Sequence, residues 1–513
     1  MQTNAKRHPC WQDVPRRLRR PPLGEDLKVD VAVVGAGITG LTTALKLRQA
    51  GLSTAVLEMH RIGGGATGFT TAHATAVLDR SFKTLTSKFG EEGARLAVQA
   101  SLEAIDRIES TAQVHGIGCD FRRLPGYRYG EEPSDAVELE VEVEIASRLG
   151  LAASFVRDVP LPAKSVGAMK VEHQARFHPM RYLDGLAAAL ESQGPCIYEH
   201  TKVLEIDDGA PCRVKVGDRT VEARAVVLAT HTPINVVLGI HTRVAPYTTY
   251  AAAFRGDFPV EDALFWDMKD PYRYIRWTED EHGRLLIVGG ADHKTGQETD
   301  TEARFQAVYE FARARFGASQ PEYEWSHEVF EPVDGLPYIG RRVGKANVYL
   351  ASGFAGNGTT FGTIAGSILS DLILGRASPY ADLFSPARVK PIAGAVEFVR
   401  ENANVAGRLV GDRLKAFERD GFADLVPGEG RLMTVDGKKR AVYCDGGGGI
   451  HVMSAVCTHF GCIVQWNGSE STWDCPCHGS RFRPTGEVLA GPAVKGLEPE
   501  RAKPASAEAP GEV

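Results

Sequence analysis

The chain has 513 residues, a formal net charge of −6 at pH 7 and nine cysteines. This length allows about three domain-sized pieces with large cores. Acidic and basic residues are nearly balanced, so the charge does not indicate binding to nucleic acid or to an anionic membrane surface. No apolar run approaches the roughly 18 residues of a membrane span, so we expect no nucleic-acid partner and no membrane span.

Residues 1–28 are predicted to form an N-terminal extension, which contains a basic run at residues 16–20. In a twin-arginine signal an apolar segment would follow such a run, but prolines and acidic residues follow here. We therefore expect a cytoplasmic protein. The cysteines expected to be ordinary reduced thiols are Cys10, Cys119, Cys196, Cys212 and Cys444.

A dinucleotide-binding fingerprint begins at residue 29. Residues 29–34 form an apolar run typical of a buried parallel strand, and a glycine-rich turn at residues 35–40 follows at once. A helix and a second strand then lead to an acidic residue placed to bind a ribose. The glycines allow close approach of a pyrophosphate, which the helix N-terminus favours. The predicted nucleotide-binding residues are Gly35, Ala36, Gly37, Ile38, Gly40 and Glu58.

Two further segments bear on the choice between FAD and NAD. A Gly/Thr-rich turn at residues 63–73 follows the ribose acid, and a strand starting at Val348 leads into a second glycine-rich loop. A helix at residues 364–374 continues from that loop. A helix N-terminus there can hold negative charge on a reduced flavin ring. The residues singled out in these segments are Thr70, Thr71, His73, Gly353, Asn357, Gly358 and Thr359.

With these segments, the chain resembles the D-amino-acid oxidase/glycine oxidase/sarcosine oxidase family of FAD enzymes. The resemblance runs from about Trp11 to residue 385. It implies an α/β FAD-binding domain of the Rossmann-like, glutathione-reductase type, with an antiparallel-sheet substrate domain. Within residues 29–385, the FAD-binding parts are expected at about 29–80, 151–238 and 328–385, and the substrate parts at about 81–150 and 239–327.

The same resemblance assigns roles to single residues. Thr70 and Thr71 would line the isoalloxazine, and residues 353–359 would face its pyrimidine end. Val203 would contact the adenine through its backbone, and the strand ending at Thr230 would pass the cofactor. In some family members a histidine in the place of His73 is bonded covalently to the flavin. Packing near the flavin without a bond is the alternative that we favour, because relatives vary here.

Residues 81–150 are predicted to be helical. Residues 137–145 alternate in a strand-like way, but the following Arg-Leu-Gly is typical of a helix end, so we predict a helix. A further helix is expected at residues 180–190. Tyrosines and threonines at residues 240–327 favour an antiparallel sheet. The family resemblance implies that this sheet covers the flavin.

Substrate-side candidates lie in this sheet. Tyr272, Tyr274 and Arg276 alternate and would share one strand face. Arg276 is a candidate to clamp a substrate carboxylate with two parallel hydrogen bonds, and a surface salt bridge is the alternative. Tyr250 and Tyr274 are further candidates.

A metal-ligand pattern stands near the C-terminus. Cys457 and His459 are followed, after 15 intervening residues, by Cys475 and His478. This spacing predicts a Rieske [2Fe–2S] cluster, in which one iron takes two thiolates and the other two imidazoles. A structural zinc site is the alternative. Zinc would not explain two further cysteines, Cys462 and Cys477, at matching offsets.

Residues 420–500 resemble the Rieske domains of the cytochrome bc and b6f type. The resemblance implies a Cys462–Cys477 disulfide, and it implies that the Ser480 hydroxyl donates to a bridging sulfur. Phe482 stands where high-potential members carry a tyrosine, which predicts a potential below the top of the Rieske range. Gly491-Pro492-Ala493 matches the loop that covers the cluster.

The whole chain resembles bacterial amine oxidoreductases that carry a C-terminal Rieske domain. A helical connector is expected at residues 386–418, packed between the flavin and Rieske domains, an all-β Rieske domain at 419–500, and a disordered tail at 501–513. The resemblance implies oxidation of an amine or amino acid at FAD. Electrons would pass to the cluster and on to an external acceptor, a protein or a quinone, as in a dehydrogenase.

The sequence also bears on two other functions. A reductase fed by NAD(P)H would need a second dinucleotide fold, and no second fingerprint follows a strand; the glycines at 446–449 lack the helix. A Rieske oxygenase would need a mononuclear iron site with two histidines and a carboxylate. His173 and His178 have a suggestive spacing, but Lys170 stands where the aspartate would be, so we set this function aside.

Overall fold

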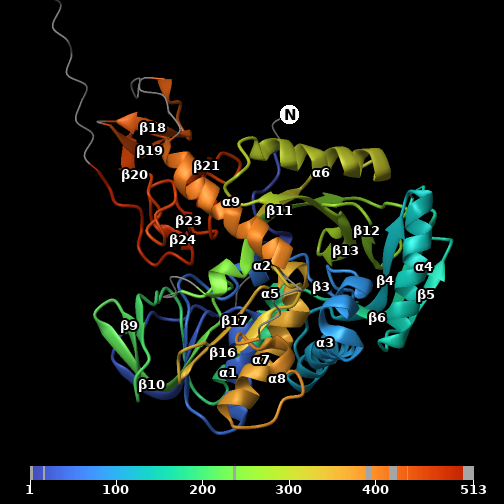
Figure 1. Ribbon diagram of the computed structural model, residues 1–513, viewed down its shortest axis with the longest axis horizontal. Coiled ribbons are helices and arrows are strands. Elements are labelled where there is room, and N and C mark those ends of the chain that lie inside the picture. Colours follow the sequence, from blue (N-terminus) through green and yellow to red (C-terminus); the bar gives the residue numbers. More distant parts are fainter. Residues whose placement is uncertain are drawn as a thin grey trace, which may run out of the picture. The chain divides into compact units, whose positions relative to one another are not determined.

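The computed structural model describes residues 4–14, 18–162, 164–234, 239–388, 395–414, 424–435 and 437–500. The chain divides into two compact units, and Figure 1 labels their elements. The first unit comprises Met1–His293 and Ala303–Val399, and the second comprises Lys294–Glu302 and Arg400–Val513. The predicted tail at 501–513 lies outside the described residues.

The first unit contains an eight-stranded sheet whose centre is parallel. Its main path is β16-β17-β10-β1-β2-β7, in which β16 is the antiparallel edge strand. The C-terminal half of β1 is fully buried, as its apolar sequence predicts. This is the expected Rossmann-like arrangement. The strands are β1 (Leu27–Val34), β2 (Thr54–Leu57), β7 (Ile197–Tyr198), β8 (Glu205–Asp207), β9 (Cys212–Val216), β10 (Arg219–Leu228), β16 (Tyr338–Arg341) and β17 (Val348–Ser352).

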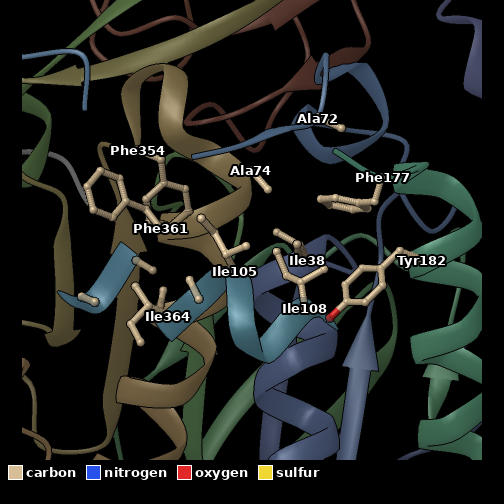
Figure 2. Packing of buried hydrophobic residues seen from close by; sticks show 14 of the residues in the cluster. Ile38, Ala72, Ala74, Ile105, Ile108, Phe177, Tyr182, Phe354, Phe361 and Ile364 are labelled. Carbon is tan, nitrogen blue, oxygen red and sulfur yellow. The ribbon is translucent and has the colours of Figure 1, made fainter. Parts of the chain in front are cut away.

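Helices α1 (Ile38–Gln49) and α7 (Gly358–Ile373) cross at small residues. A Cβ at Gly362 would lie 2.7 Å from the Ile38 side chain, so the two backbones approach closely. Figure 2 shows Ile38, Phe361 and Ile364 in one apolar cluster with residues of α3 (Phe82–Val114). This cluster holds the start of α1 and the start of α7 together. The other helices of this part are η1 (Cys10–Asp13), α2 (Ala66–Phe69), α5 (Pro179–Glu191), η3 (Ala355–Asn357) and α8 (Ala381–Phe384).

A second, nine-stranded sheet follows the path β15-β11-β14-β13-β12-β4-β6-β3, with β5 on β6. It is mostly antiparallel, but β12 and β4 are parallel. The predicted antiparallel substrate domain is therefore present. Its strands are β3 (His73–Ala74), β4 (Arg122–Gly130), β5 (Ala153–Val156), β6 (Gly167–Arg176), β11 (Val244–Arg255), β12 (Leu264–Asp267), β13 (Tyr274–Asp280), β14 (Gly283–Lys294) and β15 (Tyr323–Pro332), and η2 (Ile240–Thr242) precedes β11.

The structure differs from the predictions in three details. Strand β4 interrupts the segment at 81–150 that was expected to be helical, and β5 and β6 pair with this sheet although 151–238 was assigned to the FAD-binding part. Helix α6 (Thr301–Phe316) lies within the segment expected to be strands. In contrast, residues 137–145 are helical in α4 (Pro133–Arg148), which begins with a proline and a capping box.

The second unit contains two small antiparallel sheets, as expected for an all-β Rieske domain. One has the order β18-β19-β20 and the other β21-β22-β23-β24. Helix α9 (Ala395–Leu414) lies in the predicted connector, of which residues 389–394 and 415–418 fall outside the described parts. Residues 419–423 of the predicted Rieske segment also fall outside them. The strands are β18 (Gly430–Val435), β19 (Lys438–Cys444), β20 (Ile450–Ser454), β21 (Gln465–Asn467), β22 (Thr472–Asp474), β23 (Arg481–Phe482) and β24 (Val488–Ala490).

Among the helices that the structure describes, none combines the length and the apolarity that a membrane crossing requires.

Candidate functional site

The predicted nucleotide turn lies between β1 and α1. Gly35 has φ +104°, and a Cβ there would lie 2.5 Å from the Ala229 carbonyl oxygen. A Cβ at Gly40 would lie 2.0 Å from the Gly35 carbonyl oxygen. Both positions therefore require glycine, and the turn leads directly into the N-terminus of α1, the kind of helix end that favours a pyrophosphate.

Glu58 lies at the carboxyl end of β2 and stabilises this turn by hydrogen bonds. Its carboxylate accepts hydrogen bonds from the backbone N–H groups of Ala36 and His60, each at 2.8 Å. Burial raises the pKa of the Glu58 carboxyl. Each carboxylate oxygen can accept a second hydrogen bond, so Glu58 can still receive a ribose hydroxyl. The backbone N–H of Thr201 donates to the Glu58 carbonyl at 2.7 Å, which brings the segment of Val203 beside the turn.

The other predicted flavin-side residues come together from two distant segments. Thr359 Oγ1 donates to the His73 carbonyl at 2.7 Å, and Asn357 Nδ2 donates to the Val77 carbonyl at 3.0 Å. The hydroxyl of Thr71 lies 3.0 Å from His73 Nδ1. The Gly/Thr-rich turn and the second glycine-rich loop therefore form one site.

His73 is 7% exposed, and its Nε2 has no hydrogen-bond partner among the described residues. Burial lowers the pKa of His73 to about 3, so the ring is neutral at pH 7. A buried ring nitrogen without a partner is unfavourable unless a ligand supplies one. Its position fits a group such as FAD bound at this site.

Arg276 does not fit the two-pronged clamp predicted for a substrate carboxylate. The residue is fully buried, and its guanidinium donates to the carbonyls of Ala72 at 2.7 Å and Trp277 at 3.1 Å. Nη1 and Nε are therefore engaged, which leaves Nη2 as the nitrogen without a partner among the described residues. Arg276 holds the Ala72 backbone beside His73, and Trp11 supports the same turn by donating to the Thr70 carbonyl.

The two predicted tyrosines lie in strands β11 and β13 of the nine-stranded sheet. The hydroxyl of Tyr250 lies 2.9 Å from His293 Nε2, and that of Tyr274 lies 2.9 Å from Thr249 Oγ1. The Tyr274 ring centroid is 5.8 Å from that of His73. Tyr274 is thus the substrate-side candidate that contacts a predicted flavin residue.

Sequence reasoning missed two carboxylates in this region. Asp79 accepts hydrogen bonds from the Tyr272 hydroxyl at 3.0 Å and from the Gly356 backbone N–H at 2.6 Å. Asp292 is hydrogen-bonded by Thr249, and burial raises its pKa to about 7. They come from separate elements, so no spacing in the sequence links them.

The predicted cluster ligands stand in two loops of the same design. In each loop the carbonyl of the first cysteine accepts from a glycine N–H four residues on: Cys457 from Gly461 at 2.9 Å, and Cys475 from Gly479 at 3.1 Å. Each cysteine sulfur also accepts from two backbone N–H groups, those of residues 459 and 460 and those of residues 477 and 478. Such donors stabilise a thiolate, the form that binds iron.

The two predicted histidine ligands lie side by side. Their ring centroids are 5.1 Å apart and the ring planes are 86° to each other. His478 is buried, and this burial lowers its pKa to about 4, so its imidazole is neutral. His459 is half-buried. Two thiolates and two neutral imidazoles form the donor set of a Rieske cluster, which these residues therefore fit.

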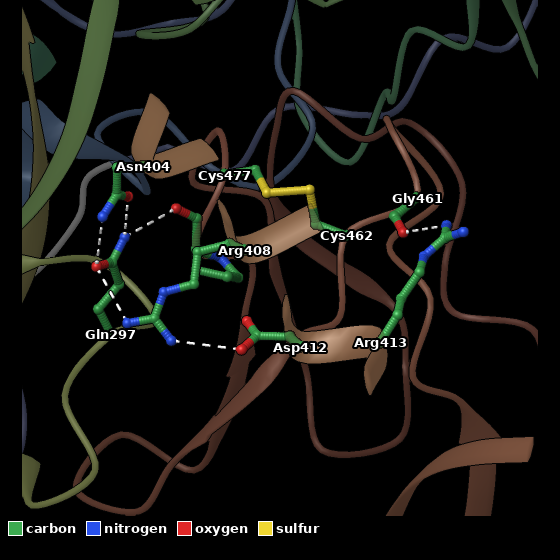
Figure 3. Close-up of a disulfide and its surroundings, with 9 residues drawn as sticks. Gln297, Asn404, Arg408, Asp412, Arg413, Gly461, Cys462 and Cys477 are labelled. Atoms are coloured by element: carbon green, nitrogen blue, oxygen red, sulfur yellow. Dashed lines mark hydrogen bonds and ion pairs between the residues drawn. A yellow bond between two sulfur atoms is a disulfide. The ribbon is translucent and has the colours of Figure 1, made fainter. Parts of the chain in front are cut away.

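The predicted disulfide is confirmed: Cys462 and Cys477 are bonded with an S–S distance of 2.01 Å (Figure 3). The Ser480 hydroxyl is fully buried and contacts the Cys457 sulfur, and it accepts from the Ala493 N–H at 3.0 Å. Phe482 is fully buried and has no hydroxyl to offer. The scattered cysteines, which are free thiols, are Cys10, Cys119, Cys196, Cys212 and Cys444.

The structure also bears on the two other functions, a Rieske oxygenase and a reductase fed by NAD(P)H. His178 caps helix α5, where its Nδ1 accepts from the Arg181 N–H at 3.3 Å. This role accounts for His178 without a mononuclear iron. The glycines at 446–449 lie in the turn between β19 and β20, so they do not begin a helix.

Comparisons with known proteins agree with both sites. Residues 30–372 match the family described as FAD dependent oxidoreductase, and residues 420–500 match the Rieske [2Fe-2S] domain. A putative Rieske 2Fe-2S iron-sulfur protein, YhfW of Bacillus subtilis, is 33% identical over 93% of this chain and 94% of that protein. The gamma-glutamylputrescine oxidoreductase of Escherichia coli is 26% identical over 72% of this chain and 89% of that protein.

Partial matches cover the two parts of the chain separately. The cytochrome b6-f complex iron-sulfur subunit 1 of Nostoc is 32% identical over 28% of this chain and 74% of that subunit. The glycine oxidase structure from Geobacillus kaustophilus aligns with a TM-score of 0.61 at 20% identity, over 71% of this chain and 99% of that one. The fold and the two sites thus define a flavin- and iron–sulfur-dependent oxidoreductase. The chain belongs to the FAD dependent oxidoreductase family and carries a C-terminal Rieske [2Fe–2S] domain, so its cofactors are FAD and a Rieske cluster.

Proposed function

We propose that the protein oxidises an amine or an amino acid at FAD and passes the electrons through the Rieske cluster to an external acceptor. The observation that carries this proposal is the presence of both cofactor domains in one chain. When bound, FAD supplies a hydride acceptor and the cluster a one-electron carrier. The names of relatives such as gamma-glutamylputrescine oxidoreductase and glycine oxidase favour a substrate with an amino group.

The roles of the cofactor-binding residues are part of the proposal. The turn at residues 35–40 and Glu58 would bind the FAD diphosphate and ribose, and the segments around His73 and Asn357 would surround the flavin ring. The cluster ligands would be Cys457, His459, Cys475 and His478, with the disulfide tying their two loops together. Burial keeps His478 neutral, as a ligand imidazole must be.

The substrate side is proposed to recognise an amine through Asp292. Its Oδ1 is buried and has no hydrogen-bond partner among the described residues. The Asp292 carboxyl has a pKa raised to about 7, so it can accept a proton from a substrate ammonium near neutral pH. Tyr274 contacts His73 and is hydrogen-bonded to Thr249, which also bonds Asp292, and it would orient the substrate. Arg276 keeps the backbone of the flavin-side turn in place and is not proposed to touch substrate.

The acceptor is proposed to meet the protein at His459. This half-buried ligand stands between Val456, which is 38% exposed, and Phe460, which is 36% exposed. Two exposed apolar side chains beside a ligand suit a protein or a quinone as acceptor. A one-electron exit of this kind favours a dehydrogenase over an oxidase that reduces oxygen at the flavin.

The test is anaerobic mixing of the holoprotein with a panel of amino acids, N-methyl amino acids and polyamines, with NADH and NADPH as separate arms. Flavin absorbance and the EPR signal of the reduced cluster are followed together. We expect an amine to bleach the flavin and the Rieske signal then to rise. Reduction by a nicotinamide alone would instead identify a reductase and overturn the proposal.

A further inference from the structure

The second unit includes a segment from far outside the Rieske domain. This segment, residues 294–302, is called the strap here, and it lies in the chain at the junction of β14 and α6. Its ends are fixed within the second unit. Lys294 forms an ion pair with Glu401 of α9, and the Ser469 backbone N–H donates to Thr301 Oγ1 at 3.2 Å. The strap is therefore held at both ends.

The middle of the strap lies against the backbone that flanks Cys475. A Cβ at Gly296 would lie 2.8 Å from the Asp474 carbonyl oxygen and 2.9 Å from the Pro476 nitrogen. Gly296 also has φ +66°, a conformation that side chains disfavour. Both facts require glycine at this position, so the strap and the second ligand loop pack backbone to backbone.

Gln297, the next residue, connects α9 to the same loop. Its Nε2 donates to Asn404 Oδ1 at 2.6 Å and to the Pro476 carbonyl at 3.4 Å. Its Oε1 accepts from Asn404 Nδ2 at 3.3 Å and from Arg408 Nη2 at 3.2 Å. Figure 3 shows these contacts around the Gln297 amide. Residues of α9 bond both the Oε1 and the Nε2 atoms of the Gln297 amide, which fixes its orientation. The amide can therefore donate a second N–H to the Pro476 carbonyl.

That carbonyl belongs to the peptide unit whose N–H is the N–H of Cys477. The Cys477 N–H donates in turn to the Cys475 sulfur. A hydrogen bond to a peptide oxygen polarises the unit and strengthens its N–H as a donor. Hydrogen bonds to ligand sulfurs are among the factors that set the potential of an iron–sulfur cluster, and they favour the more negative, reduced state.

We propose that Gln297 is a positioning residue for the cluster, which fixes and polarises the Pro476–Cys477 peptide and thereby raises the reduction potential. The inference rests on the proposed function in one respect, the assignment of Cys475 as a ligand. In this proposal the strap contributes to the cluster site of the Rieske domain, although Gln297 precedes Pro476 by 179 residues.

The experiment compares full-length holoproteins carrying Gln297→Ala or Gln297→Glu with a Thr299→Ala control. Thr299 lies in the same strap, and its side chain is exposed. The reduced Rieske EPR signal is measured at an ambient potential equal to the wild-type midpoint. The ratio of reduced to oxidised cluster is expected to fall about threefold or more in Gln297→Ala. A larger fall is expected in Gln297→Glu, because a carboxylate would face the Pro476 carbonyl oxygen, and no change is expected in Thr299→Ala.

FAD content and amine-dependent bleaching are recorded for every variant and are expected to match the wild type. Loss of the cluster from Gln297→Ala, with FAD retained and Thr299→Ala fully loaded, would support the positioning role. A fully loaded Gln297→Ala protein with the wild-type ratio would overturn the inference and leave the proposed function intact. A wild-type protein without a Rieske signal would overturn both.

Discussion

The flavin site and the iron–sulfur site are built from different atoms. The nucleotide turn depends on backbone, since Gly35 and Gly40 leave no space for a Cβ and Glu58 accepts backbone N–H groups. The proposed cluster site depends on four side chains, presented by two loops with the same backbone hydrogen bonds. The first site should therefore be sensitive to added volume, and the second to any change in ligand chemistry.

The largest effect should come from the cluster ligands. Cys475→Ser is expected to abolish the Rieske EPR signal, because an oxygen replaces one of the two soft thiolates that the cluster needs. FAD should be retained, since its predicted site lies in the first unit. Cys444→Ser is the matched control, because Cys444 is also a buried cysteine of the second unit. Loss of signal in both variants, or in neither, would contradict the ligand assignment.

The corresponding change at the nucleotide turn is Gly40→Ala. The added Cβ would lie 2.0 Å from the Gly35 carbonyl oxygen, so the turn must move. Overpacking of this kind costs about 2 kcal/mol, which corresponds to roughly thirtyfold weaker FAD binding. The check is titration of the apoprotein with FAD, with Gly24→Ala as the control because no atom lies within 4 Å of a Cβ there. Unchanged FAD affinity would show that FAD does not bind at this turn.

Removal of the disulfide should loosen the cluster site selectively. Cys462 and Cys477 are 15 residues apart, and closing a loop of that size contributes about 3 kcal/mol. The double variant Cys462→Ser/Cys477→Ser is expected to lose cluster absorbance at a lower temperature while flavin release is unchanged. Equal shifts in both transitions would mean that the two sites unfold as one.

The substrate side should respond to pH through Asp292. Its pKa is raised to about 7 by burial, so the fraction of carboxylate increases as the pH rises through 7. The second-order rate constant of flavin reduction by an amine is expected to rise over the same range. Asp292→Asn should remove this inflection and lower the rate constant about tenfold or more. Asp257→Asn, at an exposed position in the first unit, should change neither, and a wild-type profile in Asp292→Asn would exclude the role.

The smallest effects concern hydrogen bonds to the cluster. Ser480→Ala removes the hydroxyl that contacts the Cys457 sulfur and is expected to lower the midpoint potential. Phe482→Tyr adds a hydroxyl where the Rieske resemblance has one and is expected to raise it. One hydrogen bond of about 1 kcal/mol corresponds to roughly 40 mV for a one-electron couple. Redox titration followed by EPR measures both, and shifts of the same sign would contradict this explanation.

The sequence predicted the parts of each site that depend on local spacing. The glycine turn, Glu58 and the cysteine and histidine pattern all lie within short stretches whose geometry follows from the chain itself. The disulfide could be predicted only from the resemblance to Rieske domains, because spacing alone leaves other pairings open.

Features assembled from distant segments could not be predicted. Asp79 is bonded by Tyr272 and Asp292 by Thr249, each from a distant segment, so their proximity has no signal in any one stretch. Arg276 alternates correctly with Tyr274, but its position against the Ala72 carbonyl depends on the packing of another element. Strand β4 contains Pro125 and Gly126 and lacks clear alternation, which explains why residues 81–150 were predicted to be helical. Gln297 is a polar residue in a loop, and its role depends on a partner 179 residues away.

The central claim is that one chain carries electrons from a substrate amine through FAD to the cluster. It is tested most directly by anaerobic titration with the best amine of the panel, comparing the wild type with Cys475→Ser. FAD accepts two electrons and the cluster one, so the wild type should take up about one and a half equivalents of amine and the variant about one. The same endpoint in both proteins, with the wild-type cluster still oxidised, would contradict electron transfer from the flavin to the Rieske centre.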